Sequence, residues 1–371
     1  MKNLFKVIVT LLFTFAILGL MLPAAVSASS NTNTNAAQNA AQNWLEGVVA
    51  VNNEIPQWDG STVVFQQQYD NLNGEVDAYM FEIDGKTGIV GFILVGSSQY
   101  NYDILEAGAS SPPAVPSMDI VQEAIGSLGL KMSNTSISTS TNFVYTGVDG
   151  YYAVYSVQNQ KVAINLISKS ACLFSSLTPF ITPSDYQQNK IVTAQSQSEI
   201  NPLSSGWDAL PMSAWNDVSP SWCGPCSGVS IGAYYRDYMG YSGLPDNLDM
   251  YYYLYFSMYT SQFGGATMPW YYGPGFTEMT SGYGYPGVFS YTTDYAITSG
   301  DYWNVVNDIN SGWPLALEIT NDLHYRAIRG YSYSTGIPNY IICTNSETGD
   351  SWDILNWNTL GFGLFTCTII N

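Results

Sequence analysis

Short strand-like runs joined by tight turns recur in both halves of this chain, and they constrain its fold more than any other feature. Asp84-Gly85, Asp149-Gly150 and Gln158-Asn159 separate neighbouring runs, and such dipeptides favour two-residue hairpin turns between antiparallel strands. We expect strands at residues 61–68, 75–83, 88–96, 143–147, 151–157, 161–167, 313–320, 324–331, 339–345 and 352–357. Helical stretches separate these groups of strands, so the pattern predicts an α+β protein.

Three stretches have helical periodicity and lie between the groups of strands. A helix capped by Ser117 places its apolar residues on one side. Residues 223–239 are compatible with a helix whose small side chains allow close packing, and residues 301–311 form a second amphipathic helix. A short helix is also expected around Trp44.

Changes in composition divide the chain into segments. Residues 178–206 are rich in Pro, Gln, Ser and Asn and are typical of an exposed linker that proteases can cut. This linker separates an α+β domain at 44–177 from a second domain at 207–371. The low-complexity stretch 29–43 is expected to be a flexible lead-in.

The first 28 residues have the pattern of a secretory signal peptide. Lys2 and Lys6 precede an apolar run from Val7 to Leu22, and small residues up to Ala28 provide a cleavage site. We therefore expect a secreted, extracellular protein with no membrane span after the signal is removed.

The charge balance excludes two classes of partner. The chain has 29 acidic residues against 10 basic ones, for a net charge of −19. So acidic a surface repels phosphate backbones and anionic lipids, which argues against nucleic-acid binding and electrostatic membrane binding.

The single histidine of the chain, His324, limits the catalytic chemistry. The chain has no second CxxC motif to build a zinc site, and no G-x-S-x-G elbow for a serine hydrolase. We expect no metal and no cofactor. A cysteine acting together with His324 is the remaining combination for nucleophilic catalysis.

Cys223, His324 and Asn345 lie in an order suited to that chemistry. Cys223 begins a predicted helix, whose positive end favours a thiolate. His324 opens a strand after a turn, and Asn345 ends the next strand. An amide there can hold the imidazole in the orientation that a thiolate needs.

Three segments resemble the bacteriocin-processing (double-glycine) peptidase-like family within the papain-like cysteine peptidases. They are SWCGPCSGVSIGAYYRDYMGY, DYWNVVNDINSGWPLALEITNDLHYRAIRGYS and YIICTNSETGDSWDILNW, and they occur in the family's order over about 207–360. The N-terminal segment NGEVDAYMFEIDGKTGIVGFILVG more loosely resembles the propeptide domains that precede secreted papain-like peptidases.

The resemblance implies a papain-like C-terminal domain that hydrolyses protein or peptide substrates. Cys223 would be the nucleophile, His324 the general acid and base, and Asn345 the residue that orients His324. The N-terminal domain would act as an inhibitor, so that the chain is made as a zymogen.

The oxyanion hole and the third catalytic position leave alternatives open. The family has a Gln about six residues before its cysteine, where this chain has Asp217. Asn216 is the nearest amide and the candidate oxyanion donor; loss of such a donor costs on the order of 10²–10³ in rate. Asp350 and Asp353 are alternatives to Asn345.

Two other functions compete with the peptidase. Trp222 to Cys226 spell the thioredoxin motif WCGPC, so Cys223 and Cys226 are an alternative redox pair, with Pro269 at a suitable distance for that fold's proline. The missing Gln instead favours an exported binding protein without catalysis. Cys343 and Cys367, both in strand-like stretches, are candidate cross-strand neighbours.

Overall fold

The computed structural model describes residues 31–51, 54–130, 138–200, 206–218, 222–319, 324–334, 337–360 and 364–371. The predicted signal peptide at 1–28 lies outside these residues. No helix in the described ranges combines the length and the apolar character needed to cross a lipid bilayer.

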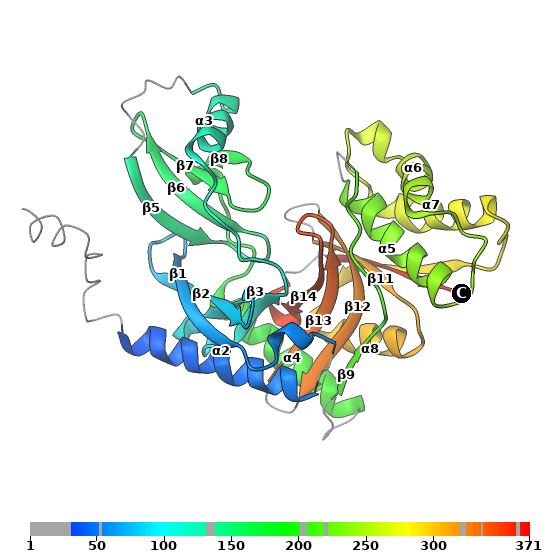
Figure 1. Cartoon of the computed structure of the whole chain (residues 1–371), viewed down its shortest axis with the longest axis horizontal. Coiled ribbons are helices and arrows are strands. Elements are labelled where there is room, and N and C mark those ends of the chain that lie inside the picture. Colours follow the sequence, from blue (N-terminus) through cyan, green and yellow to red (C-terminus); the bar gives the residue numbers. More distant parts are fainter. Residues whose placement is uncertain are drawn as a thin grey trace, which may run out of the picture.

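The described part of the chain is an α+β protein built on one large, mostly antiparallel sheet of 15 strands (Figure 1). The strand order is β10-β15-β11-β12-β13-β14-β4-β3-β2-β1-β5-β6-β7-β8, with β9 paired to β12. Among the described strands, only the β1–β5 pair is parallel. The N-terminal strands are β1 (Thr62–Asp70), β2 (Val76–Gly85), β3 (Gly88–Gly96), β4 (Ile104–Gly108), β5 (Ser138–Tyr145), β6 (Tyr151–Val157), β7 (Gln160–Asn165) and β8 (Ala171–Leu173). The C-terminal strands are β9 (Gly206–Ala209), β10 (Ser290–Ile297), β11 (Leu315–Ile319), β12 (His324–Ser334), β13 (Ile337–Asn345), β14 (Asp350–Asn356) and β15 (Leu364–Ile370).

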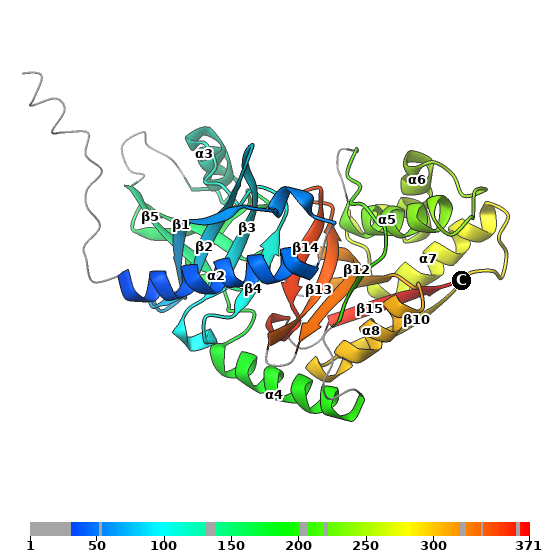
Figure 2. The same ribbon diagram turned by 60° about the horizontal axis from the view of Figure 1, so that its bottom comes forward.

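Seven α-helices accompany the sheet in the described residues. They are α2 (Asn31–Val51), α3 (Met118–Ser127), α4 (Pro183–Ile200), α5 (Cys223–Asp237), α6 (Asn247–Ser257), α7 (Pro269–Gly282) and α8 (Tyr302–Asn310). Helices α5, α6 and α7 cluster at the C-terminal end of the molecule, whereas α2 and α4 run along the N-terminal strands and the middle of the sheet (Figure 2).

Strands β4 and β14 join the two halves of the chain, which we define as residues 31–177 and 206–371. Ile354 pairs with Ala107 and Leu355 with Glu106, so the edge strand of one half continues the sheet of the other. The two predicted domains therefore share backbone hydrogen bonds as well as side-chain contacts.

Helix α2 covers this junction with an apolar cluster. Ala37, Ala41 and Leu45 of α2 are buried together with Tyr340 and Ile342 of β13. Two further clusters lie within the halves, one around the N-terminal strands and one around α5 to α8 and the C-terminal strands. The described residues thus form a separate core in each half and a third core between them.

Most of the predicted strands and helices are confirmed, and β3 and β6 have the predicted bounds. The flexible lead-in at 29–43 is wrong over its described part, because Asn31–Val51 is one helix. Ala37 and Ala41 of this helix are fully buried, which explains how so polar a sequence is held in a helix.

The exposed linker at 178–206 is also wrong over most of its length. Residues Pro183–Ile200 form α4, where Tyr186 donates a hydrogen bond to Asp103 (2.8 Å) and Asn189 donates one to the Asn358 carbonyl (3.2 Å). These contacts reach both halves, so α4 fastens the halves together.

Helix α5 packs closely on α6 through its glycines. A β-carbon on Gly228 would lie 2.8 Å from Leu254 Cδ1, and one on Gly232 would collide with Met250. The predicted small-residue face is confirmed as a helix-packing face. Helix α5, which begins at Cys223, also packs on β12 of the sheet.

Candidate active site

The strand pairing brings His324 and Asn345 to one end of the sheet. His324 is the first residue of β12 and Asn345 is the last residue of β13. Because these strands are antiparallel neighbours, the start of one lies beside the end of the other. Helix α5 packs on β12, and it begins at Cys223.

Asn345 links His324 to a buried carboxylate. Its Oδ1 lies 3.2 Å from His324 Nε2 and accepts a hydrogen bond from the backbone N–H of Glu347 (3.0 Å). Its Nδ2 donates to Asp353 Oδ2 (3.1 Å). Nδ2 needs an acceptor and has the Asp353 carboxylate, and Oδ1 needs donors and has the Glu347 backbone N–H. This fixes the amide with Oδ1 toward the imidazole, so His324 Nε2 donates the hydrogen bond to it.

Cys223 is hydrogen-bonded to the same imidazole. Burial by itself lowers the pKa of His324, but a hydrogen bond with Cys223 and the charges of Cys223, Glu347 and Asp149 together raise the pKa to about 9. The His324 ring is 4% exposed, and its Nδ1 lies 3.9 Å from Glu347 Oε1. This environment favours an imidazolium beside the sulfur atom.

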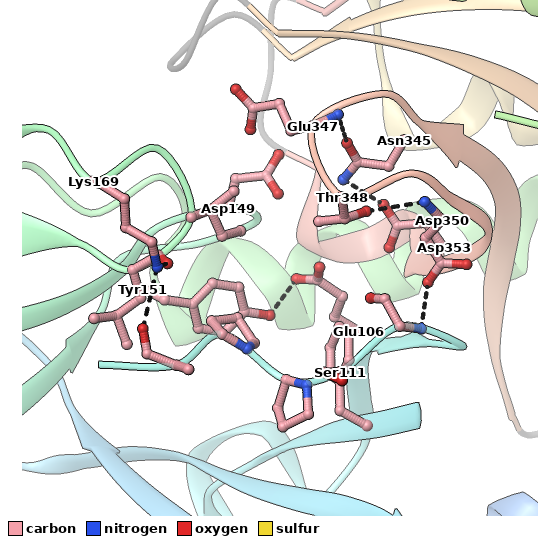
Figure 3. A pocket seen from close by; sticks show the side chains of 17 residues that line it. Glu106, Ser111, Asp149, Tyr151, Lys169, Asn345, Glu347, Thr348, Asp350 and Asp353 are labelled. Carbon is pink, nitrogen blue, oxygen red and sulfur yellow. Dashed lines mark hydrogen bonds between the residues drawn. The ribbon is translucent and has the colours of Figure 1, made fainter. Parts of the chain in front are cut away.

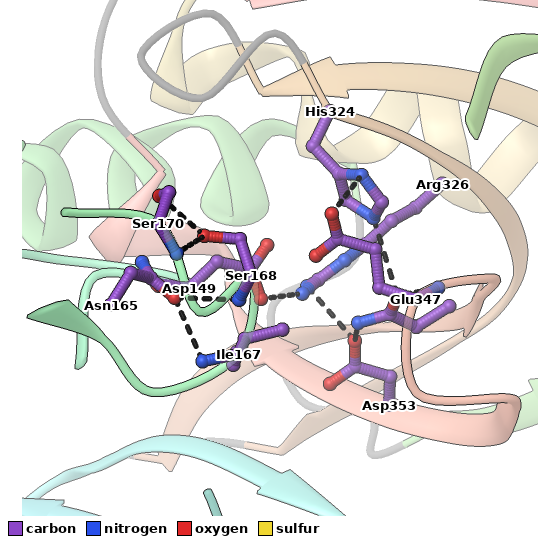
Figure 4. Close-up of polar contacts among 10 residues, drawn as sticks. Asp149, Asn165, Ile167, Ser168, Ser170, His324, Arg326, Glu347 and Asp353 are labelled. Atoms are coloured by element: carbon purple, nitrogen blue, oxygen red, sulfur yellow. Dashed lines mark hydrogen bonds and ion pairs between the residues drawn. The ribbon is translucent and has the colours of Figure 1, made fainter. Parts of the chain in front are cut away.

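A buried arginine lies next to these residues and binds both halves of the chain. Arg326 is fully buried. Its Nη2 lies 2.5 Å from Asp149 Oδ1, and its Nη1 lies 3.0 Å from Asp353 Oδ2. Asp149 belongs to the turn between β5 and β6, so a carboxylate of the N-terminal half reaches beneath His324 (Figure 4).

Glu106 adds a third carboxyl group to this cluster. It is buried on β4 and accepts a hydrogen bond from the Tyr151 hydroxyl (2.6 Å), as Figure 3 shows. Burial raises the pKa of Glu106 well above its usual range, and the charges of Asp353 and Asp149 raise it further, against the effect of Arg326. Burial also raises the pKa of Asp353, which Arg326 opposes.

Residues of the N-terminal half cover the imidazole side of the site. A cavity of about 280 Å³ lies between them and the pair His324 and Glu347. Its walls on the N-terminal side are Asp149, Tyr152, Asn165, Ile167, Ser168 and Ser170. A second cavity of about 370 Å³ lies on the other side of Glu347, between β4 and the β13–β14 turn (Figure 3).

The two alternative third residues have different places. Asp353 contacts Arg326 and accepts the hydrogen bond from Asn345 Nδ2, so it helps to hold the amide in place. Asp350 instead accepts hydrogen bonds from the backbone N–H groups of Ser110 (3.0 Å) and Trp352 (2.8 Å). Asn345 is therefore the predicted third residue that the structure places at His324.

Asn216 lies at the same end of the sheet. A β-carbon on Gly349, in the turn that connects Asn345 to Asp350, would lie 3.3 Å from Asn216 Nδ2. The side chain is half-buried, whereas Asp217 is exposed. The role of Asn216 as an oxyanion donor stays a prediction.

None of the five cysteines, all of which lie in the described residues, forms a disulfide. The expected neighbourhood of Cys343 and Cys367 is wrong, because β11 and β12 lie between β13 and β15 in the sheet. Both thiols are fully buried, and each pairs in register with an apolar residue: Cys343 with Ile328 and Cys367 with Ala316.

The thioredoxin interpretation required a buried strand that runs into the cysteine motif. Residues 210–218 before the motif have no regular strand, and the chain after α5 continues into further helices. Pro269 is the first residue of α7, so it does not lead directly into a strand. The motif does mark a helix start, which both interpretations predicted.

Arg326, Asp149, Glu106 and Glu347 were not predicted as site residues. Alternation along β12 was a usable signal for Arg326, because residues two apart in a strand share a face and His324 was already a candidate. In the described ranges, no group of three His, Cys, Asp or Glu side chains is arranged to hold a metal ion.

Comparisons of the chain with protein-family models, with curated proteins and with solved structures found no match.

Proposed function

We propose that this chain is an exported, papain-like cysteine peptidase that uses Cys223, His324 and Asn345. The observation that carries the proposal is the hydrogen-bonded series from the Cys223 thiol through His324 to Asn345. It is built from a helix start and two antiparallel strands, and Asn345 is in turn held by Asp353.

The reaction assigned to this series is acyl transfer. The Cys223 thiolate attacks the carbonyl carbon of a peptide bond, and His324 gives a proton to the departing amine. His324 then takes a proton from water, which hydrolyses the thioester and releases Cys223. The start of α5 supplies backbone N–H groups and positive dipole character at the developing oxyanion.

We also propose that the N-terminal half keeps this site latent. Asp149 forms an ion pair with Arg326 beside the triad, and the loops of β5 to β8 leave little of His324 exposed. A substrate that reaches the imidazole must displace this turn. The continuous sheet through β4 and β14 supports movement of the turn, rather than loss of the whole half, as the opening step.

Hydrolysis of an unfolded protein such as casein tests the proposed activity. We expect the full chain to cleave it slowly, and Cys223→Ala and His324→Ala to show no cleavage. Cys172→Ala, which removes a thiol on β8, is the matched control and should retain the wild-type rate. Cleavage that persists in Cys223→Ala would contradict the proposal.

A further inference from the structure

Cys226 has no part in the proposed peptidase reaction, yet its position relative to Cys223 is specific. The two residues occupy the first and fourth positions of α5, and the backbone N–H of Cys226 bonds to the carbonyl of Trp222 (3.0 Å). Three residues along an α-helix separate Cα atoms by about 5 Å, which lies within the range that a disulfide spans.

The two thiols differ in access and in chemistry. Cys223 is half-buried and is hydrogen-bonded to His324. Cys226 is 0% exposed, and burial together with the charge of Cys223 raises the pKa of Cys226 to about 12. An external reagent therefore reacts first with Cys223, whereas Cys226 is a buried, protonated thiol.

The other cysteines lie on strands rather than on α5. Cys343 and Cys367 are buried on β13 and β15, and Cys172 lies on β8 in the N-terminal half. Cys226 is thus the only second thiol on the helix that presents Cys223.

We propose that Cys223 and Cys226 form a reversible disulfide within α5 when the protein meets a low-molecular-weight disulfide. In this disulfide, Cys223 can no longer attack a substrate. The inference rests on the proposed function in one respect, namely that Cys223 is a reactive nucleophile.

The reaction is two successive thiol–disulfide exchanges. The Cys223 thiolate attacks one sulfur of the small disulfide, forms a mixed disulfide and expels the first small thiolate. Cys226 then gives its proton to that thiolate and attacks Cys223 Sγ, which forms the Cys223–Cys226 bond and expels the second small thiolate. The second small thiolate takes the proton of the His324 imidazolium. The two cysteines thus lose two electrons, and the small disulfide is reduced to two thiols.

The position at a helix start also explains why the bond would be reversible. The positive end of a helix stabilises the thiolate that leaves when such a disulfide is reduced, and a better leaving thiolate speeds reduction. Small thiols would therefore restore Cys223 readily.

Mass mapping of the full chain tests this inference without relying on peptidase activity. The reduced protein is exposed to oxidised glutathione, free thiols are trapped with N-ethylmaleimide, and the peptides are weighed. We expect the wild-type peptide containing residues 223–226 to lack two hydrogens and to carry neither reagent. Cys226→Ala should instead retain glutathione on Cys223, and Cys343→Ala, which removes an equally buried thiol, should behave as wild type.

The same samples separate this inference from the proposed function. Oxidation should lower casein hydrolysis at least about tenfold, and a small dithiol should restore it. If the disulfide forms in a protein that hydrolyses nothing, the proposed function fails and the modification stands. Glutathione that stays on Cys223 of the wild type, or two thiols that both remain free, would overturn the inference.

Discussion

At the scale of single residues, the position of Asn345 depends on its partners on both sides. Its Oδ1 accepts from His324 and from the Glu347 backbone, and its Nδ2 donates to Asp353. His324, Asn345 and Asp353 are buried. Water therefore cannot easily take over the hydrogen bonds that the Asn345 amide makes. The orientation of the imidazole therefore follows from a network that includes the buried cluster.

Asn345→Ala should lower both stability and activity. The change removes the hydrogen bond of the buried His324 Nε2 and one of the two partners of Asp353, which keeps its ion pair with Arg326. Such a loss in a buried site costs about 1–3 kcal/mol of the free energy of unfolding. An imidazole free to turn would lower casein hydrolysis by about 10²-fold. Urea unfolding and the hydrolysis assay measure the two effects.

Asn73→Ala provides the control for this change, because Asn73 lies in an exposed turn of the N-terminal half. It should alter neither quantity. If Asn345→Ala matched Asn73→Ala in both assays, Asn345 would have no orienting role.

The residues of the candidate triad could be predicted from residue type and order, whereas the charged cluster around them could not. A single histidine left few choices, and the residues at the helix start and the strand end followed. The sequence predicts Asp149 only as part of a hairpin turn. Its contact with Arg326 joins residues 177 positions apart, and no local pattern encodes such a contact.

At the scale of elements, prediction succeeded where local pattern and tertiary environment agree. Strand β6 is bounded by tight turns and has the predicted bounds. Helix α4 was missed because its polar composition matches a linker, and its few anchoring residues contact distant parts of the chain. The tyrosine-rich α6 and α7 were missed because aromatic residues occur all around them, so no periodicity was visible.

The turn between β5 and β6 is the element that we propose to hold the site latent. Asp149→Ala removes its ion pair with Arg326 and leaves that guanidinium with Asp353. Loss of one partner from a buried charge cluster costs about 3–5 kcal/mol, and much of this cost should appear as opening of the turn. We expect casein hydrolysis by Asp149→Ala to exceed the wild-type rate several-fold.

Asp84→Ala is the matched variant, because it removes an exposed carboxylate at the end of β2 in the same half. Its hydrolysis rate should equal that of the wild type. A rate for Asp149→Ala that stays at the wild-type value, in a protein shown to be folded by circular dichroism, would contradict latency through this turn.

At the scale of the whole molecule, the two halves behave as parts of one structure. They share the β4–β14 pairing, the apolar cluster beneath α2, and the buried ions around Arg326. Composition suggested two domains and a linker, and the sheet topology adds what composition cannot show, namely how the halves are joined. Removing the N-terminal half would expose the edge of β14 and an apolar surface.

The pairing of Cys223 with His324 makes the stability of the folded protein depend on pH, because the pKa of His324 is raised to about 9. A free imidazole has a pKa of about 6.5. The pairing therefore stabilises the folded protein fully below about pH 6.5, and this contribution is lost as the pH rises through the folded value. The imidazolium is thus present over the range where an ordinary thiol is protonated and unreactive.

The rate at which iodoacetamide alkylates Cys223 at about pH 6 tests this pair most directly, because an isolated thiol with a pKa near 8.5 reacts slowly there. With the adduct mapped to Cys223 by mass, we expect the wild type to react at least about tenfold faster than His324→Ala. Equal rates in the two proteins would contradict the pairing of Cys223 with His324.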